Sequence, residues 1–153
     1  MENLKNLLKM NWLTSTIGIA AFIGFADSIY LSAVRYLGWI PDCKIVSGCE
    51  EVLSSPYAVT AGIPVSVLGI IYYTLILILL NLYFSKPIGR WINLIRLCAT
   101  IGMVTVLYFL YIQAFVLNAW CVYCLVSAAA SAVIFIGSFS LKYKMENKGG
   151  VVI

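Results

Sequence analysis

Histidine is absent from this 153-residue chain, and charged side chains make up only 10% of it. The absence of histidine removes the commonest general base near neutral pH, the usual haem ligand and most catalytic zinc sites. The scarcity of charge, with 63% hydrophobic residues, excludes a soluble globular domain, because such domains carry about 25% charged residues. The ten lysines and arginines are scattered and form no dense basic stripe, so nucleic acid is not an expected partner. We expect a membrane protein with lipid around it.

Long apolar stretches take the place of the missing charge. A membrane-spanning helix needs about 20 apolar residues, and windows of this kind cover residues 11–32, 63–83, 91–117 and 121–141. Because the bilayer core cannot solvate bare backbone, each window is predicted to be a helix. The sequence therefore predicts an all-α membrane protein, a four-helix transmembrane bundle that forms a single domain over residues 1–153.

One substantial stretch lies outside these windows, at residues 33–62. It mixes polar and apolar side chains, so we expect it to lie on the membrane surface as a cap between the first and second helices. A short helix is predicted within it at residues 48–55.

The distribution of lysine and arginine predicts the orientation. One side of the membrane receives eight of these residues: Lys5, Lys9, Lys86, Arg90, Arg96, Lys142, Lys144 and Lys148. The other side receives only Arg35 and Lys44, both in the cap. Positive residues remain on the cytoplasmic side. We therefore expect a plasma (inner) membrane protein with both termini in the cytoplasm and the cap on the extracytoplasmic side.

The cysteines are the most informative residues. Cys43 and Cys49 form one close pair in the cap, and Cys121 and Cys124 form a C-x-x-C at the outer start of the fourth window. On a helix, this spacing places two Cβ atoms about 5–6 Å apart, and the helix N-terminus favours a thiolate, above all at Cys121. Because both pairs are expected on the same oxidising side, we interpret them as a relay of exchanging disulfides. Two inert structural disulfides or a four-thiolate zinc site are the alternatives.

Cys98 is separate from these pairs. It lies about 29 Å from the outer face, by the rise of a helix, so it is predicted to be a small buried apolar residue. Electrons that enter a relay need an acceptor. Without histidine, a nucleotide-binding glycine loop or iron–sulfur spacing, elimination leaves a lipid-soluble quinone, and no metal is expected.

Further candidates lie near the outer face. Asp27 is in the outer third of the first window and shares a face with Tyr30. An ionisable group at that depth indicates function, although snorkelling or bonding to the cap backbone is the alternative. Tyr108 and Tyr111 are candidates for a quinone pocket, with an interfacial aromatic belt as the alternative.

The motifs follow one another in a specific order. They are D-S-I-Y-L at 27–31, S-G-C-E-E-V-L-S-S at 47–55, G-I-P-V-S-V-L-G at 62–69, the pair Tyr72 and Tyr73, and W-C-V-Y-C at 120–124. A C-x5-C, a serine six positions later and a C-x-x-C at the last helix complete the pattern. Over about residues 27–125 the chain resembles the vitamin K epoxide reductase family, in its stand-alone prokaryotic form.

The resemblance implies a four-helix bundle around a quinone of the menaquinone, ubiquinone or phylloquinone type. It implies that Cys43 exchanges with a thioredoxin-like protein, that Cys49 is the shuttle to Cys121, and that Cys124 is the thiolate that attacks the quinone. Many prokaryotic members carry a fused thioredoxin-like domain that this chain lacks. The expected partner is therefore a separate protein.

Two more positions follow from the resemblance. Ser55 matches the cap serine near the family's site, and Val65 stands where vertebrate members have asparagine, which favours quinone reduction over epoxide reduction. The predicted function is a membrane thiol oxidoreductase that passes electrons to a quinone and supports extracytoplasmic disulfide formation. Its alternatives are a vitamin K epoxide or quinone reductase proper, and a non-enzymatic membrane scaffold with structural disulfides.

Overall fold

The structure, a computed structural model, describes residues 2–38, 48–60, 62–85 and 89–141, with side chains from residue 12 onward. Cys43, the cap residues 39–47 and the C-terminal tail 142–153 lie outside the described residues. Along the chain the elements are helix α1 (Glu2–Leu37), helix α2 (Cys49–Ser54), 3-10 turn η1 (Pro56–Ala58), strands β1 (Val59–Thr60) and β2 (Ile63–Pro64), helix α3 (Val65–Ser85), helix α4 (Gly89–Tyr111), π-helical turn η2 (Ile112–Leu117) and helix α5 (Val122–Ser140).

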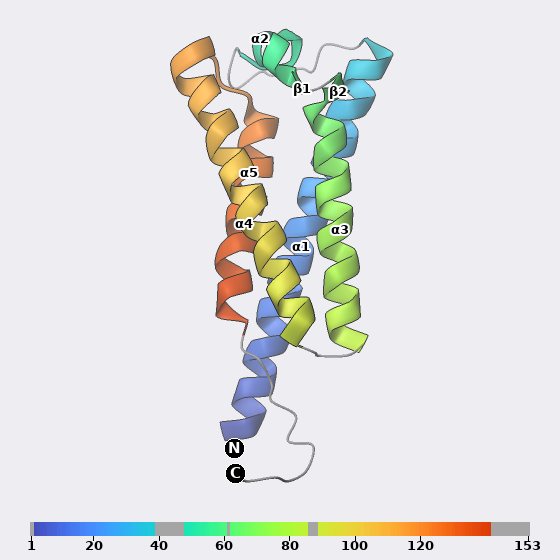
Figure 1. Ribbon diagram of the computed structural model, residues 1–153, viewed down its shortest axis with the longest axis vertical. Coiled ribbons are helices and arrows are strands. Elements are labelled where there is room, and N and C mark those ends of the chain that lie inside the picture. The colour runs from blue at the N-terminus through green and yellow to red at the C-terminus, as the bar shows by residue number, and fades with distance from the viewer. Residues whose placement is uncertain (1, 39–47, 61, 86–88, 142–153) are drawn as a thin grey trace.

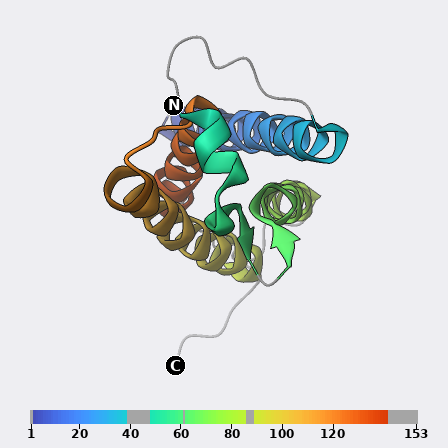
Figure 2. The ribbon, with the colours of Figure 1, turned by 90° about the horizontal axis from the view of Figure 1, so that it is seen from above.

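Four long helices form the body of the molecule. α1 packs against both α3 and α5, and α4 packs against the same two, so that the helices close a ring (Figure 2). In the described part of the chain, four helical segments are long and apolar enough to cross a membrane: Trp12–Leu37, Val65–Ser85, Gly89–Leu117 and Val122–Ser140. The predicted four-helix membrane bundle is confirmed, and the protein is a multi-pass membrane protein.

The cap lies across one end of the ring, with α2 and the short hairpin of β1 and β2 above the helices (Figure 1). β1 and β2 pair antiparallel, with Thr60 opposite Ile63. Gly62 has a φ of +81° in this turn, a conformation that glycine adopts without the clash of a Cβ atom. The predicted short helix of the cap is confirmed as α2.

Helix boundaries differ from the sequence prediction at the end that carries the cap. α1 continues to Leu37 instead of ending at residue 32, because Val34 is buried and the Arg35 guanidinium donates a 2.8 Å hydrogen bond to the Leu53 carbonyl of α2. The second membrane helix begins at Val65 instead of residue 63, because Ile63 pairs with β1. The cap is therefore shorter than the predicted 33–62.

The outward faces of the helices are apolar. Phe22 of α1, Ile78 of α3, Val104 of α4 and Ile136 of α5 are all more than half exposed. In a soluble protein such a surface is an aggregation hazard, whereas in a bilayer it contacts lipid tails at no cost. The inward faces supply one core that runs through the bundle and includes Ile17, Ile76, Ile95 and Ile134.

A tyrosine joins three helices in this core. The Tyr73 hydroxyl of α3 donates to the Ser127 carbonyl at 2.7 Å and lies 2.9 Å from the Ser131 hydroxyl, both on α5. Its ring covers Gly24 of α1, where a Cβ atom would overlap the ring carbons. Because α1 has no side chain at this position, the tyrosine reaches across it to α5.

This contact predicts a difference between two glycines of α1. Gly24→Ala forces the Tyr73 ring to move and is expected to destabilise the protein by about 1–3 kcal/mol, the usual effect of overpacking. A Cβ atom added at Gly18 would meet no neighbour within 4 Å, so Gly18→Ala is the matched control and gains helix propensity. Thermal unfolding in detergent measures both; equal melting temperatures contradict the packing argument.

Candidate thiol redox site

The C-x-x-C lies where α5 begins. Cys121 is the residue that caps the helix, with φ −107° and ψ 116°, and its sulfur accepts a hydrogen bond from the Cys124 N–H at 3.4 Å. This bond satisfies one of the free N–H groups of a first helical turn. The N–H of Cys121 in turn donates to Oε1 of Gln113 at 3.1 Å. The backbone N–H and the sulfur of Cys121 are therefore both held by hydrogen bonds.

A π-helical turn prepares this entry into α5. α4 passes into η2 at Ile112, and the turn ends at Asn118, which has the left-handed φ of +50° that asparagine tolerates. The Ala119 N–H then donates to the Gln113 carbonyl at 3.1 Å. Gln113 thus binds the returning chain with its backbone and its side chain. Single π turns of this kind are frequent at functional sites.

The cap brings a third cysteine to this point. Cys49 of α2 and Cys121 are 1% and 0% exposed and belong to one buried apolar cluster with Val52 and Ala119. Cys49 is disulfide-bonded, whereas Cys121 and Cys124 are free thiols. Cys98 is also a free thiol, but it packs against the main core of the bundle and takes no part in this cluster.

Close backbone contact fixes the cap over α5. A Cβ atom at Gly48 would lie 2.7 Å from the Trp120 backbone nitrogen and 3.2 Å from the Ala119 side chain. Any other residue type therefore pushes the two segments apart. The φ of Gly48, −156°, is open to every residue. Glycine is therefore required here by the close approach and not by the backbone conformation.

Hydrogen bonds make Cys121 acidic. The Cys124 side chain, followed by the backbone N–H groups of Cys124 and Tyr123, holds the pKa of the Cys121 thiol below its usual range, although burial opposes this effect. The helix N-terminus contributes in the way the sequence predicted. Cys121 is therefore the thiol of the pair that is set up to carry negative charge.

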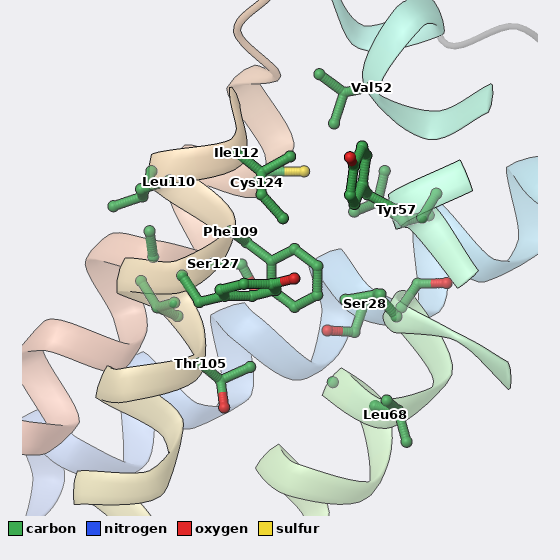
Figure 3. A pocket seen from close by; sticks show the side chains of 18 of the residues that line it. Ser28, Val52, Tyr57, Leu68, Thr105, Phe109, Leu110, Ile112, Cys124 and Ser127 are labelled. Atoms are coloured by element: carbon green, nitrogen blue, oxygen red, sulfur yellow. The ribbon is translucent and has the colours of Figure 1, made fainter. Parts of the chain in front are cut away.

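A large cavity opens below the cap. It has a volume of about 580 Å³ and its lining is mostly apolar, with residues from the cap (Val52, Tyr57), α1 (Ser28, Leu31), α3 (Leu68, Tyr72), α4 (Thr105, Phe109) and α5 (Cys124, Ser127). Figure 3 shows the Cys124 sulfur pointing into this space below Val52. Cys121 is not among the lining residues. The two cysteines thus face different surroundings, Cys121 the cap and Cys124 the cavity.

Two of the other predicted residues line the cavity. Ser55 is buried there, and its hydroxyl donates to the Val52 carbonyl at 2.8 Å, which ends α2. Tyr108 contributes to the wall from α4. The sequence-based placement of Tyr111 beside it is not what the structure shows, because Tyr111 is 59% exposed, packs on Phe115 and does not line the cavity.

The remaining two predicted residues, Asp27 and Tyr30, lie close to the C-x-x-C. Tyr30 packs on Tyr123 with ring centroids 5.0 Å apart. Within the described part of the chain, the Oδ2 atom of Asp27 is buried without a hydrogen-bond partner, and its carboxyl group acts electrostatically on both Cys121 and Cys124. Asp27 therefore borders the thiols, whereas neither it nor Tyr30 lines the cavity.

Sequence reasoning missed Gln113. Its signal was an uncharged polar side chain eight residues before Cys121, in the stretch 106–117 whose other residues are apolar or aromatic. Its position in space depends on the π-helical turn, which no sequence pattern announced.

The comparison with known protein families decides the classification. The model of the vitamin K epoxide reductase family matches residues 15–139, most of the chain. The chain belongs to this family. Among curated proteins it is similar to the thiol-disulfide oxidoreductase LTO1 of Arabidopsis thaliana, with 36% identity over 124 residues. The match takes in 71% of this chain and 31% of that relative, so the chain spans about a third of the relative's length.

The acidity of Cys121 predicts a titration in this member of the family. An ordinary thiol ionises near pH 8.5, and a lowered pKa means that thiolate is already present below that pH. Thiolate ultraviolet absorbance of the fully reduced protein is expected to rise in a step at lower pH. The step disappears in Cys121→Ser and remains in Cys98→Ala; its survival in Cys121→Ser contradicts the assignment.

Proposed function

We propose that this protein is a membrane thiol oxidoreductase that passes electrons from a reduced thioredoxin-like partner through two cysteine pairs to a quinone. The observation that carries the proposal is an order in space. The cap cysteine Cys49 and Cys121 belong to one buried cluster, and Cys124, one helical turn further on, faces the cavity. Electrons that enter at the cap therefore have a direct path to the cavity.

The exchange between the pairs proceeds one sulfur at a time. The Cys49 thiolate attacks the Cys121 sulfur of the Cys121–Cys124 disulfide, so that a Cys49–Cys121 bond forms and Cys124 leaves as thiolate. Cys43 then attacks Cys49, which forms the Cys43–Cys49 disulfide and expels Cys121 as thiolate. Cys49 disulfide-bonded beside free Cys121 and Cys124 thiols corresponds to the stage after this exchange.

The lowered pKa of Cys121 suits this step. In thiol–disulfide exchange, a leaving thiol of lower pKa departs faster. Cys121 is the group expelled when the mixed disulfide resolves, so its hydrogen bonds accelerate the forward direction. Cys121, the thiol with the lowered pKa, then exchanges with the cap cysteines, and Cys124, the thiol that faces the cavity, reduces the quinone.

The cavity fits a quinone as substrate. Its volume of about 580 Å³ lies within the range of roughly 300–1,000 Å³ found for small-molecule pockets, which are mostly apolar with a few polar groups. The Cys121 and Cys124 dithiol gives two electrons and two protons to the quinone. The products are a hydroquinone and the Cys121–Cys124 disulfide, ready for the next cycle.

The partner and the side of the membrane complete the proposal. The curated relative is named a thiol-disulfide oxidoreductase, which supports exchange with a protein thiol. The lysine and arginine distribution supports an extracytoplasmic cap in the plasma membrane, where the product of the cycle is new disulfide bonds. Cys43, which precedes the described part of the cap, is the residue we assign to the partner.

One observation favours a quinone over an epoxide. Val65 lines the cavity, and its side chain offers no hydrogen-bond donor at the position where vertebrate members carry asparagine. A structural scaffold is disfavoured because a free dithiol at a helix N-terminus does not cross-link helices.

Cysteine substitutions test this function. Anaerobic reduction of a short-chain quinone by purified protein and a small dithiol is expected to fall to background in Cys121→Ala and Cys124→Ala, because each variant loses the dithiol that supplies two electrons. Cys98→Ala is the matched control and keeps most of the activity. Near-normal turnover by Cys124→Ala overturns the proposed order of transfer.

Cap contact gives a second test. Gly48→Ala displaces Cys49 from Cys121, and an ångström-scale misplacement of reacting groups slows a reaction by about a hundredfold. Oxidation of a thioredoxin-like protein is expected to slow to this extent, whereas a small lipid-soluble dithiol that reaches Cys124 through the cavity keeps part of its rate. Ser54→Ala, on the exposed side of α2, is the control. Equal losses with both reductants would show that the cap does not carry the electrons.

A further inference from the structure

Gln113 joins the C-x-x-C to the cavity. Its side chain is 3% exposed, its Oε1 atom accepts the Cys121 N–H at 3.1 Å, and the residue lines the cavity beside Cys124. The orientation of the amide follows from chemistry, because only its oxygen can accept a hydrogen bond from an N–H group. The NH₂ end therefore points away from Cys121.

This NH₂ group carries two donors. No hydrogen-bond acceptor is paired with it among the described residues, and it is also absent from the fully enclosed unpaired polar atoms of that part of the chain, which are Oδ2 of Asp27 and the Tyr72 hydroxyl. A donor that is unpaired but not enclosed borders open space, and the open space beside Gln113 is the cavity. A buried donor without a partner costs free energy. A ligand that accepts a hydrogen bond from this group is therefore bound more tightly.

We infer that Gln113 is a substrate-binding residue whose side-chain NH₂ group donates a hydrogen bond to a carbonyl oxygen of the quinone. The inference rests on the proposed function, since it assumes that a quinone occupies the cavity. It adds the group that recognises the polar part of this substrate, next to the sulfur that reduces it.

The geometry gives this bond a role in the reaction as well as in binding. As electrons enter the quinone, negative charge develops on its oxygens, and a fixed donor stabilises that charge more than it stabilises the neutral ring. The oxygen of the same amide accepts the Cys121 N–H. One side chain therefore fixes the position of the quinone ring relative to the dithiol. The π-helical turn η2 is what aims this amide at both.

Two substitutions separate the two ends of the amide. Gln113→Glu keeps an oxygen for the Cys121 N–H, and only its protonated form can donate to a carbonyl. Gln113→Met has a similar length and neither function. Thr100→Val on α4 is the control, because the Thr100 side chain is exposed and donates only to the Arg96 carbonyl of its own helix.

The experiment measures binding of a short-chain naphthoquinone to oxidised protein, in which the C-x-x-C does not titrate, together with the infrared carbonyl band of the bound quinone. In the wild type the band is expected at lower frequency than in lipid. Gln113→Met binds about tenfold more weakly, the effect of one lost hydrogen bond, and loses the shift. Gln113→Glu binds well at low pH and progressively worse as the pH rises through the glutamate pKa, whereas wild type and Thr100→Val show no such loss.

The other outcomes have separate meanings. If Gln113 only positions Cys121, Gln113→Met slows reduction of the Cys121–Cys124 disulfide by a small dithiol but leaves the quinone affinity and the carbonyl band unchanged, and the inference is wrong. The same conclusion follows if the affinity of Gln113→Glu is independent of pH. If the wild type binds no quinone, the proposed function fails and this inference fails with it.

Discussion

The approach of the cap backbone to the chain that leads into α5 is the contact on which the site depends. Gly48 lies so close to Trp120 that no side chain fits between them, and this closeness brings Cys49 into the same buried cluster as Cys121. The Arg35 bond to the Leu53 carbonyl holds the far end of α2 to α1. With α2 fixed at both ends, the cap lines the cavity above the bundle and brings Cys49 to the side of the C-x-x-C where Cys121 lies.

Two features below the cap give the C-x-x-C its asymmetry. Cys121 caps the helix and collects its hydrogen bonds, whereas Cys124 is one turn deeper and opens onto the cavity. The Cys124 side chain and the N–H groups of the first helical turn both lower the pKa of Cys121, so the more acidic thiol is the outer one. The proposed quinone meets the inner one, because the cavity lies on that side. Under the proposed function, helix geometry therefore assigns the two tasks to two different cysteines.

The bundle and the position of the C-x-x-C at the start of the last helix could be predicted because both depend on composition and spacing. The apolar windows located all four membrane helices, and the C-x-x-C can be located directly from the sequence. Helix ends were less predictable: α1 continues beyond residue 32 because of contacts with a cap that is remote in sequence. Tyr108 and Tyr111 were grouped because both are aromatic residues near the outer face, but three steps of a helix leave about 60° between their directions. Tyr108 reaches the cavity and Tyr111 does not. The position of the Gln113 side chain could not be predicted, because it depends on the π-helical turn and this turn has no sequence signature.

Burial of Cys49 and Cys121 in one cluster also shields these two sulfurs from dissolved reagents. At 1% and 0% exposure these residues offer no sulfur to dissolved thiols or oxidants, and exchange reactions need direct access to a sulfur atom. The redox buffer of the compartment therefore cannot reset this junction. Under the proposed function, the oxidation state of the C-x-x-C is set from two sides, by the protein that docks on the cap and, at Cys124, by the small molecules that enter the cavity, the quinone among them.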